Sequence, residues 1–413
     1  MKKRIVVTGM GVITSLGNNR DTYWANLSAG QNGIGPVTKF EINEQYGSRI
    51  ASEVKDFNIE NYISAKQARR IDLFTQYGLA ASMDAISDAG LKLENEALDR
   101  IGVVASSGIG GLTTLETEFF NLFQKGPRRV SPFFVPMIIT DILPGYISIF
   151  LGLKGPNYST VSACASSSHA IGDSFRIIQN GDADIMLAGG AEATITPMGI
   201  AGFSAIKALS TRNDDPEHAS RPFDALRDGF VIGEGAGILV LEELEHALAR
   251  NAKIYGEIVG YGCTADAYHV TAPHPDGTGA VRAMDRAIKD AGLTTNDVDY
   301  INAHGTSTPP NDRTETKAIK TLFGDRAFEI PISSTKSMIG HLLGASGAVE
   351  LIATLLGMSH QEIHPTRNQF VPDPECDLNY VPDQKLEKEV HVALSNSFGF
   401  GGHNVCLAVK KYQ

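Results

Sequence analysis

Residues 158 to 175 read YSTVSACASSSHAIGDSF, and their pattern changes from that of a strand to that of a helix. Polar and apolar side chains alternate over Tyr158–Val161, as in a strand. Beyond Cys164, apolar side chains recur at helical spacing and share one face: Ile171, Phe175 and Ile178. Asn180 and Gly181 supply a helix stop. The stretch therefore predicts a strand, a tight turn that contains Cys164, and a helix.

The composition is that of a globular protein with a large core. With 413 residues the chain is long enough for roughly two or three domains. Its hydrophobic content of 42% and charged content of 20% argue against disorder. The formal net charge of −11 argues against nonspecific binding to nucleic acid or an anionic membrane. No apolar run approaches the roughly 20 residues of a membrane helix, so we expect neither partner.

Short apolar runs alternate with helical patterns along most of the chain, which predicts an α/β protein with largely buried sheets. The runs expected to be strands are Ile5–Thr8, Ile101–Ala105, Ile185–Ala188, Gly237–Leu241, Tyr255–Gly260 and Val392–Leu394. The expected helices are Phe74–Ala89, Ala165–Gln179, Leu241–Arg250, Gly279–Ala291 and Ser346–Met358. We place a domain boundary where the charged helix ends, which divides the chain into residues 1–254 and 255–413.

Cys164 has several possible roles on local grounds. Four widely spaced cysteines are too few for a disulfide scaffold, so a reducing cytoplasm is expected. At a helix start, the helix dipole and free N–H groups stabilise the thiolate of Cys164, and its small neighbours leave room for a substrate. A buried filler, half of a disulfide and a metal ligand are the alternatives, and the local pattern alone favours the inert filler. A nucleophile also needs bases and oxyanion donors elsewhere in the chain.

Other reactive side chains also follow predicted strands, where sites collect in α/β proteins. His304 ends the run Val298–His304, and Lys336 and His341 follow a strand expected over Glu329–Ile332. Glu350 is the one charged residue of a helix that is otherwise apolar over 345–358, so it needs a partner such as Lys336 or a backbone donor. The stretch NSFGFGGHN, residues 396 to 404, has glycines that permit close backbone approach to a ligand.

Three local patterns resemble sites for other chemistry but are not interpreted as such. The glycines at 108–111 and 233–237 lack the full dinucleotide-binding fingerprint. His360–His364 has a misplaced glutamate for a metalloprotease helix, and Pro365 follows at once. The basic residues at 66–70 and 128–129, with Lys207 and Arg212, are by default a solvated surface.

Together these motifs resemble the β-ketoacyl-acyl carrier protein synthases, the condensing enzymes of fatty acid synthesis, and in particular their elongating type II members. The resemblance runs from VVTGMGVITSLG (6–17) to NSFGFGGHN (396–404) and includes SACASSSHAIG, NAHGTSTP and SSTKSMIGHLLGASGAVE in the family's order. It implies a thiolase-like fold of two similar halves stacked in five layers, α-β-α-β-α. It also implies an acyltransferase that acts as a homodimer, with acyl carrier protein as its partner.

The resemblance further implies a role for each matching residue. Cys164 would take the acyl chain, and His304 and His341 would stabilise the enolate left when malonyl-acyl carrier protein loses carbon dioxide. Lys336 would orient the site, with Glu350 behind it, and Phe400 would supply an oxyanion-hole N–H and a gate. Residues that would contact the phosphopantetheine arm or line the acyl pocket are Thr306, Thr308, Ile109, Phe203 and Phe398. Residues that would dock the acidic carrier are Lys66, Arg69, Arg70 and Lys207. No metal and no cofactor of the enzyme's own are implied, since the carrier brings the phosphopantetheine.

Three positions depart from the family pattern, at Asp141, Pro310 and His403, and leave the acyl chain-length preference and the gate open. Two rival functions share the motifs. One is a ketosynthase of a dissociated polyketide pathway. The other is a non-catalytic chain-length partner subunit, which the presence of Cys164, His304 and His341 argues against.

Overall fold

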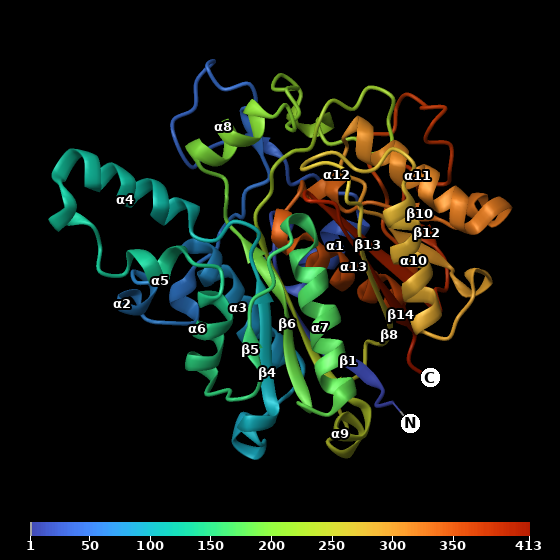
Figure 1. Ribbon diagram of the computed structural model, residues 1–413, viewed down its shortest axis with the longest axis horizontal. Coiled ribbons are helices and arrows are strands. Elements are labelled where there is room, and N and C mark those ends of the chain that lie inside the picture. The colour runs from blue at the N-terminus through green and yellow to red at the C-terminus, as the bar shows by residue number, and fades with distance from the viewer. Residues whose placement is uncertain (1) are drawn as a thin grey trace.

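A computed structural model describes residues 2–413. Over this range one mixed sheet of ten strands crosses the molecule (Figure 1). In order across the sheet the strands are β10 (Ile332–Ser333), β9 (Tyr300–Asn302), β13 (Val392–Gly399), β14 (His403–Lys410), β8 (Gly256–Ala265), β1 (Ile5–Ile13), β7 (Gly235–Glu243), β6 (Ile185–Glu192), β4 (Ile101–Ser106) and β5 (Asn157–Tyr158). Two short ribbons lie outside it: β2 (Gly35–Pro36) with β3 (Ile50–Ala51), and β11 (Glu362–Ile363) with β12 (Leu386–Glu387).

The sheet repeats one strand order twice. From the sheet edge inward, β5-β4-β6-β7-β1 has the same parallel and antiparallel pairings as β10-β9-β13-β14-β8. The two halves join through the first strand of each, where Ile5, Val6 and Val7 of β1 pair with Ile258, Glu257 and Gly256 of β8. The repeat confirms two similar halves, while independent domains divided at residues 254/255 stay a prediction.

Helices cover both faces of each half. Their bounds are α1 (Arg20–Ser28), α2 (Ala65–Ala68), α3 (Leu73–Asp88), α4 (Leu112–Lys125), α5 (Phe134–Ile138), α6 (Ile142–Leu151), α7 (Ser166–Asn180), α8 (Pro197–Ala205), α9 (Leu244–Ala249), α10 (Thr278–Asp290), α11 (Pro309–Phe323), α12 (Lys336–Ile339) and α13 (Ser346–His360). Helices α7 and α13 touch each other and strands of both halves, so they form the central layer. Helix α3 covers the outer face of the first half and α10 that of the second, which gives the five-layer α-β-α-β-α fold.

The predicted elements are found with changed ends. Strand β1 continues to Ile13 and β7 to Glu243, so the helix expected over Leu241–Arg250 shrinks to α9, because buried pairing with β1 extends the strand. The strand expected over Glu329–Ile332 was wrong for most of its length, since only β10 pairs with β9. Within residues 2–413, no helix has the length and apolar character needed to cross a membrane.

Candidate functional site

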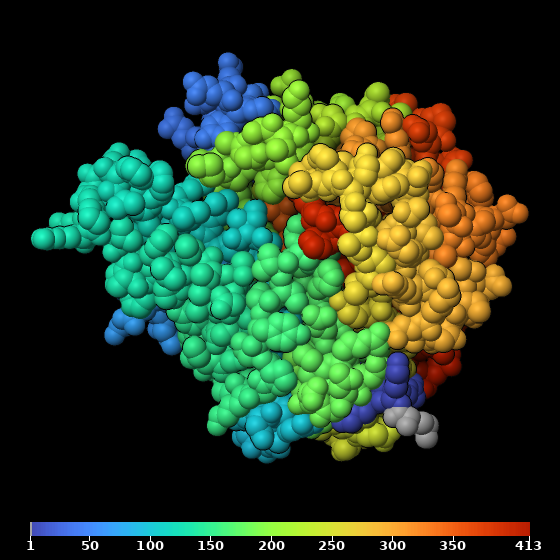
Figure 2. All heavy atoms as spheres, viewed as in Figure 1, coloured from blue at the N-terminus to red at the C-terminus, as the bar shows by residue number. Residues whose placement is uncertain are grey.

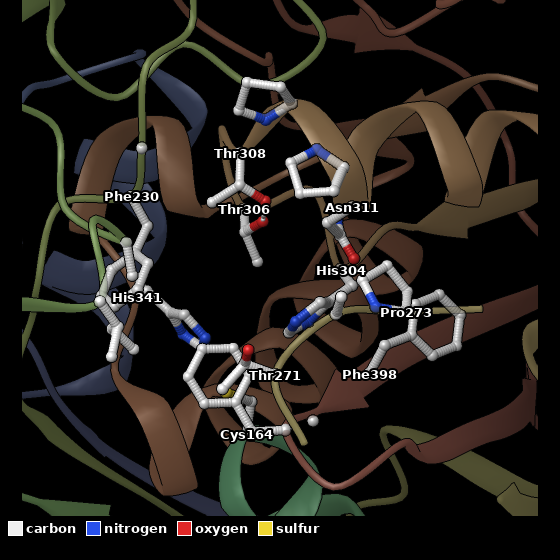
Figure 3. Close-up of a pocket in the computed structure, with 18 of the residues that line it drawn as sticks. Cys164, Phe230, Thr271, Pro273, His304, Thr306, Thr308, Asn311, His341 and Phe398 are labelled. Atoms are coloured by element: carbon white, nitrogen blue, oxygen red, sulfur yellow. Dashed lines mark hydrogen bonds between the residues drawn. The ribbon is translucent and has the colours of Figure 1, made fainter. Parts of the chain in front are cut away.

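The predicted reactive residues meet in one pocket between the two halves. Cys164, His304 and His341 line it, and Thr306 and Thr308 lie on the side opposite Cys164 (Figure 3). In the space-filling view, red atoms of the C-terminal segment lie in a recess between green and yellow segments (Figure 2). The pocket is therefore built by strand ends from both copies of the repeated strand order.

Cys164 lies in a single 3₁₀ turn, Ala163–Ala165, directly before α7. Strand β5 ends at Tyr158, so the approach to the cysteine is a loop rather than the strand predicted to Val161. Ala163 takes a left-handed conformation, with φ of 52°. Gly399 packs against this turn, where a Cβ would lie 2.6 Å from the Ser162 carbonyl oxygen. The cysteine side chain is buried at 7% exposure.

The electrostatics of Cys164 differ from the sequence-based prediction. Burial raises the pKa of the Cys164 thiol to about 11, although Lys336 and backbone N–H groups of Phe400 and Cys164 pull it down. Desolvation disfavours the charged form of any buried acid. The expectation that the helix start provides a thiolate at neutral pH is therefore wrong for this structure. The backbone N–H groups of Phe400 and Cys164 nevertheless interact with the Cys164 sulfur.

The two histidines face each other across the pocket. Their ring centroids are 5.4 Å apart with an interplanar angle of 83°, and one nitrogen of each lies within 4.8 Å of the other and of Cys164 Sγ. Burial lowers the pKa of His304 and of His341 well below the usual range, and Lys336 adds to the effect. Both imidazoles are therefore neutral at pH 7.

Neighbouring donors fix the histidine tautomers. The backbone N–H of Leu343 donates to His341 Nδ1 at 3.2 Å, and Ser346 Oγ lies 2.8 Å from the same atom. At His304 the ammonium of Lys336, which can only donate, lies 3.5 Å from Nδ1. With Nδ1 accepting in both rings, the remaining proton is on Nε2. The site thus presents two neutral N–H donors to the pocket.

Lys336 and Glu350 form a fully buried pair behind the histidines. Lys336 Nζ donates to the His304 carbonyl oxygen at 2.7 Å and forms an ion pair with Glu350 Oε1. Both side chains are 1% exposed. Burial raises the pKa of Glu350, and the charge of Lys336 opposes this shift. The structure confirms the prediction that Glu350 needs a partner and that Lys336 can serve.

Cys164, His304 and His341 have ligand types suited to zinc, but their surroundings do not fit a metal. To bind a cation through Nε2, each imidazole would have to move its proton to Nδ1. There it would face the Leu343 N–H at His341 and the Lys336 ammonium at His304. Ligating histidines instead usually donate from the second nitrogen to an acceptor. The arrangement is suited to donating hydrogen bonds to a substrate oxygen.

The structure places most, but not all, of the other predicted residues at the pocket. Residues that line it are Phe203, Lys207, Thr306, Thr308, Phe398 and Phe400, together with the departure Pro310. The ring of Phe398 lies 5.8 Å from that of His304. Ile109 is 40% exposed and does not line this pocket, so its place in an acyl pocket stays a prediction. The His403 ring lies 6.4 Å from that of His169, and Asp141 is exposed at the start of α6.

The four predicted docking residues do not form a single cluster. Lys207 lies at the pocket just after α8, whereas Lys66, Arg69 and Arg70 are exposed on and after α2, away from α8 in Figure 1. The guanidinium of Arg70 lies 4.9 Å from the centre of the Phe133 ring. A docking surface that includes all four must therefore reach from the end of α8 to α2.

Sequence reasoning missed several residues that shape the site. Glu315 on α11 accepts hydrogen bonds from the backbone N–H groups of His304 and Gly305, and burial raises its pKa to about 7. Asp266 and Asn404 bond to each other at 2.7 Å beside the pocket. Glu192, in GGAEA at the end of β6, is a lone acid among small buried residues, which was the only local signal for it.

Comparison with protein families accounts for this arrangement. Residues 2–247 match the N-terminal domain of the beta-ketoacyl synthases, and residues 255–370 match their C-terminal domain. The chain belongs to the β-ketoacyl synthase family. Among similar ketosynthases is the 3-oxoacyl-[acyl-carrier-protein] synthase 2 of Synechocystis sp., 57% identical over 412 residues, which cover 100% of this chain and 99% of the relative. The Staphylococcus aureus synthase 2 is 54% identical over 411 residues, with 100% and 99% coverage.

Solved ketosynthase structures agree with the fold over the whole chain. A beta-ketoacyl synthase from Burkholderia phymatum is 38% identical with a TM-score of 0.92, and each chain is covered completely. A type II polyketide acyl-carrier protein in complex with its ketosynthase, bound to the hexaketide, gives 34% identity, a TM-score of 0.92 and complete coverage of both chains. The ishigamide ketosynthase/chain length factor is 36% identical with a TM-score of 0.93, and both chains are covered completely.

Proposed function

We propose that this ketosynthase elongates fatty acids by a decarboxylating condensation. Malonyl-acyl carrier protein and an acyl chain bound to Cys164 would give 3-oxoacyl-acyl carrier protein and carbon dioxide. The observation that carries the proposal is the meeting of Cys164 with two neutral imidazole N–H donors in one pocket. The names of the Synechocystis and Staphylococcus relatives, at 57% and 54% identity, support the same reaction.

In the first half-reaction, Cys164 attacks the thioester carbonyl of an acyl carrier protein. A bond forms between the sulfur and the acyl carbon, and the bond to the phosphopantetheine sulfur breaks. Since Cys164 starts as a thiol, the proton that it loses balances the proton that the departing thiol gains. The N–H groups of Cys164 and Phe400 stabilise the tetrahedral oxyanion, as donors fixed before the reaction do most effectively.

In the second half-reaction, the malonyl group loses carbon dioxide. The electron pair of the broken C–C bond stays on the thioester fragment, which becomes an enolate. The Nε2–H groups of His304 and His341 donate to the enolate oxygen, and one such donor is worth about 3 kcal/mol in comparable sites. The enolate carbon then attacks the acyl thioester and releases the Cys164 thiolate, which takes up a proton. Lys336 holds the His304 backbone and keeps Nδ1 free of its proton. We propose that no metal and no cofactor besides the carrier's phosphopantetheine take part.

The partners of the reaction are an acyl carrier protein and a second copy of the chain. The polyketide neighbour, which is bound to its acyl-carrier protein, supports the carrier as a partner. We propose that the carrier docks at Lys66, Arg69, Arg70 and Lys207. Helix α4 projects from the body (Figure 1). Its exposed apolar side chains are Leu115, Phe119, Phe120, Leu122 and Phe123. A patch of this kind on a single chain is typical of an interface, so we propose a homodimer. Four free cysteines suit the reducing cytoplasm.

A polyketide pathway is the second candidate, because one solved ketosynthase similar to this chain comes from a type II polyketide synthase. Mass spectrometry after incubation with a panel of acyl carrier protein thioesters tests both functions. An acyl adduct on Cys164 that is absent from Cys164→Ala supports the mechanism. Transfer of straight saturated chains to Cys164 favours fatty acid elongation, and transfer of poly-β-keto chains favours the polyketide role. The absence of any adduct would exclude acyl transfer by this site.

A further inference from the structure

Glu192 ends strand β6 with a fully buried side chain, and the two half-reactions described above do not use it. Its carboxylate accepts four hydrogen bonds, from Ser107 Oγ at 2.8 Å and the backbone N–H groups of Gly108, Ile109 and Gly344 at 2.8, 3.3 and 2.9 Å. No lysine or arginine among residues 2–413 forms a hydrogen bond to it. Burial of a charge without a cation is unfavourable unless such bonds compensate.

The four donors belong to two loops that meet at the carboxylate. Residues 107–109 follow β4, and Gly344 belongs to the turn Leu343–Ala345 just after His341. The two backbones approach so closely that a Cβ on Gly344 would lie 2.3 Å from the nitrogen of Gly108. A Cβ on Gly108 would in turn lie 2.9 Å from Glu192 Oε2. The carboxylate therefore connects the loop after β4 to the turn after His341.

Leu343 lies between two anchored groups in this turn. Its φ is 47°, a left-handed conformation that a residue other than glycine keeps only where its surroundings enforce it. Its own N–H donates to His341 Nδ1, and the N–H of the next residue, Gly344, donates to Glu192. Its side chain lines the pocket. Without the bond at Gly344, Leu343 is free to relax and to withdraw its N–H from His341.

We propose that Glu192 is a positioning residue that holds Leu343 in place. The Leu343 N–H in turn keeps His341 in the Nε2–H tautomer and oriented toward the same pocket as Cys164. The proposal rests on the function proposed above. Condensation uses the His341 donor, whereas acylation uses Cys164 and backbone N–H groups. Loss of Glu192 therefore impairs the second half-reaction selectively and leaves the first largely intact.

The test compares the two half-reactions in Glu192→Ala, Glu192→Gln and the native protein. Acylation of Cys164 is followed by mass spectrometry, and condensation by mixing pre-acylated protein with malonyl-acyl carrier protein. In E192A we expect condensation to fall at least about tenfold, with acylation within about threefold of the native rate. In E192Q the amide oxygen can still accept from Gly108 and Gly344, which hold the turn after His341, so condensation recovers to within about threefold; the NH2 faces the Ser107 hydroxyl, and only the weaker bond from the Ile109 N–H is lost.

Glu53 offers a matched control. It is also a buried carboxylate that accepts bonds from Thr38 and Lys39, and it does not line the pocket. Glu53→Ala should lower the Tm without changing the ratio of the two rates. Equal loss of both half-reactions in E192A, or no loss of condensation, would overturn the positioning role. A native protein that takes no acyl group at all would instead refute the proposed function.

Hydrogen exchange on the native protein keeps the proposal testable if E192A does not fold. The amides of Gly108 and Gly344 share one acceptor oxygen, Glu192 Oε2, so they should be protected to a similar degree. Fast exchange at Gly344 beside slow exchange at Gly108 would show that the turn after His341 is not held by Glu192, and would overturn the proposal.

Discussion

The reactivity of Cys164 should rise with pH far beyond the neutral range. Burial raises the pKa of its thiol from the ordinary 9.0 to about 11. The difference corresponds to about 3 kcal/mol against the thiolate, even with Lys336 and two N–H groups nearby. At pH 8 about one thiol in a thousand is then ionised, compared with about one in ten at the ordinary pKa of 9.0. The thiolate pool is thus about 100 times smaller.

Alkylation with iodoacetamide measures this directly, because the thiolate is the species that reacts. Samples quenched at intervals between pH 7 and pH 10 are digested, and the Cys164 peptide is quantified by mass spectrometry. The rate should increase about tenfold per pH unit over the whole range. N-acetylcysteine in the same tube is the control, and its rate should level off in the upper part of the range. The slope decides the result, because limited access to the buried sulfur lowers all rates alike.

A curve for Cys164 that flattens below about pH 8.5 would refute the dominance of burial, and would mean that the helix start and Lys336 prevail. The charge of Glu192 raises the pKa of Cys164. Glu192→Gln should therefore move the curve to lower pH, and circular dichroism across the range checks that both proteins stay folded.

Three further outcomes are expected. His304→Ala should leave acylation of Cys164 intact and slow condensation about a hundredfold, as measured with pre-acylated protein, because one enolate donor is lost. Lys336→Met should lower the free energy of unfolding in urea by about 3–5 kcal/mol, because it leaves the carboxylate of Glu350 buried without a partner, and adding Glu350→Gln should restore part of the loss. Charge reversal at Arg69 and Arg70 should raise KM for carrier-bound substrate and not for a small acyl thioester, whereas equal change on both would exclude docking there.

Local pattern was sufficient to predict the helix after Cys164, whereas the strands before Cys164 and Lys336 are much shorter than predicted. Helix α7 begins at Ser166, and the apolar face that the spacing predicts is buried in the central layer. The partnership of Lys336 with Glu350 could likewise be predicted, since one carboxylate in an apolar buried helix needs a donor. In both cases the deciding interaction follows from residues close together in the sequence.

Features that depend on distant contacts could not be predicted in this way. The pKa of Cys164 is set mainly by burial between the two halves, which no local pattern reports. The bonds of Glu192 reach residues 83 to 152 positions away, so nothing in its own stretch reveals them.

The place of β14 in the sheet has a consequence for biosynthesis. This strand, Val405 and its neighbours, pairs with both β13 and β8, so the last strand of the sheet to be translated is inserted in its middle. Until residue 410 has left the ribosome, β8 lacks its outer neighbour and the second half cannot close around His304 and His341. A nascent chain can therefore expose Cys164 early, but the complete pocket forms only after β14 has been synthesised.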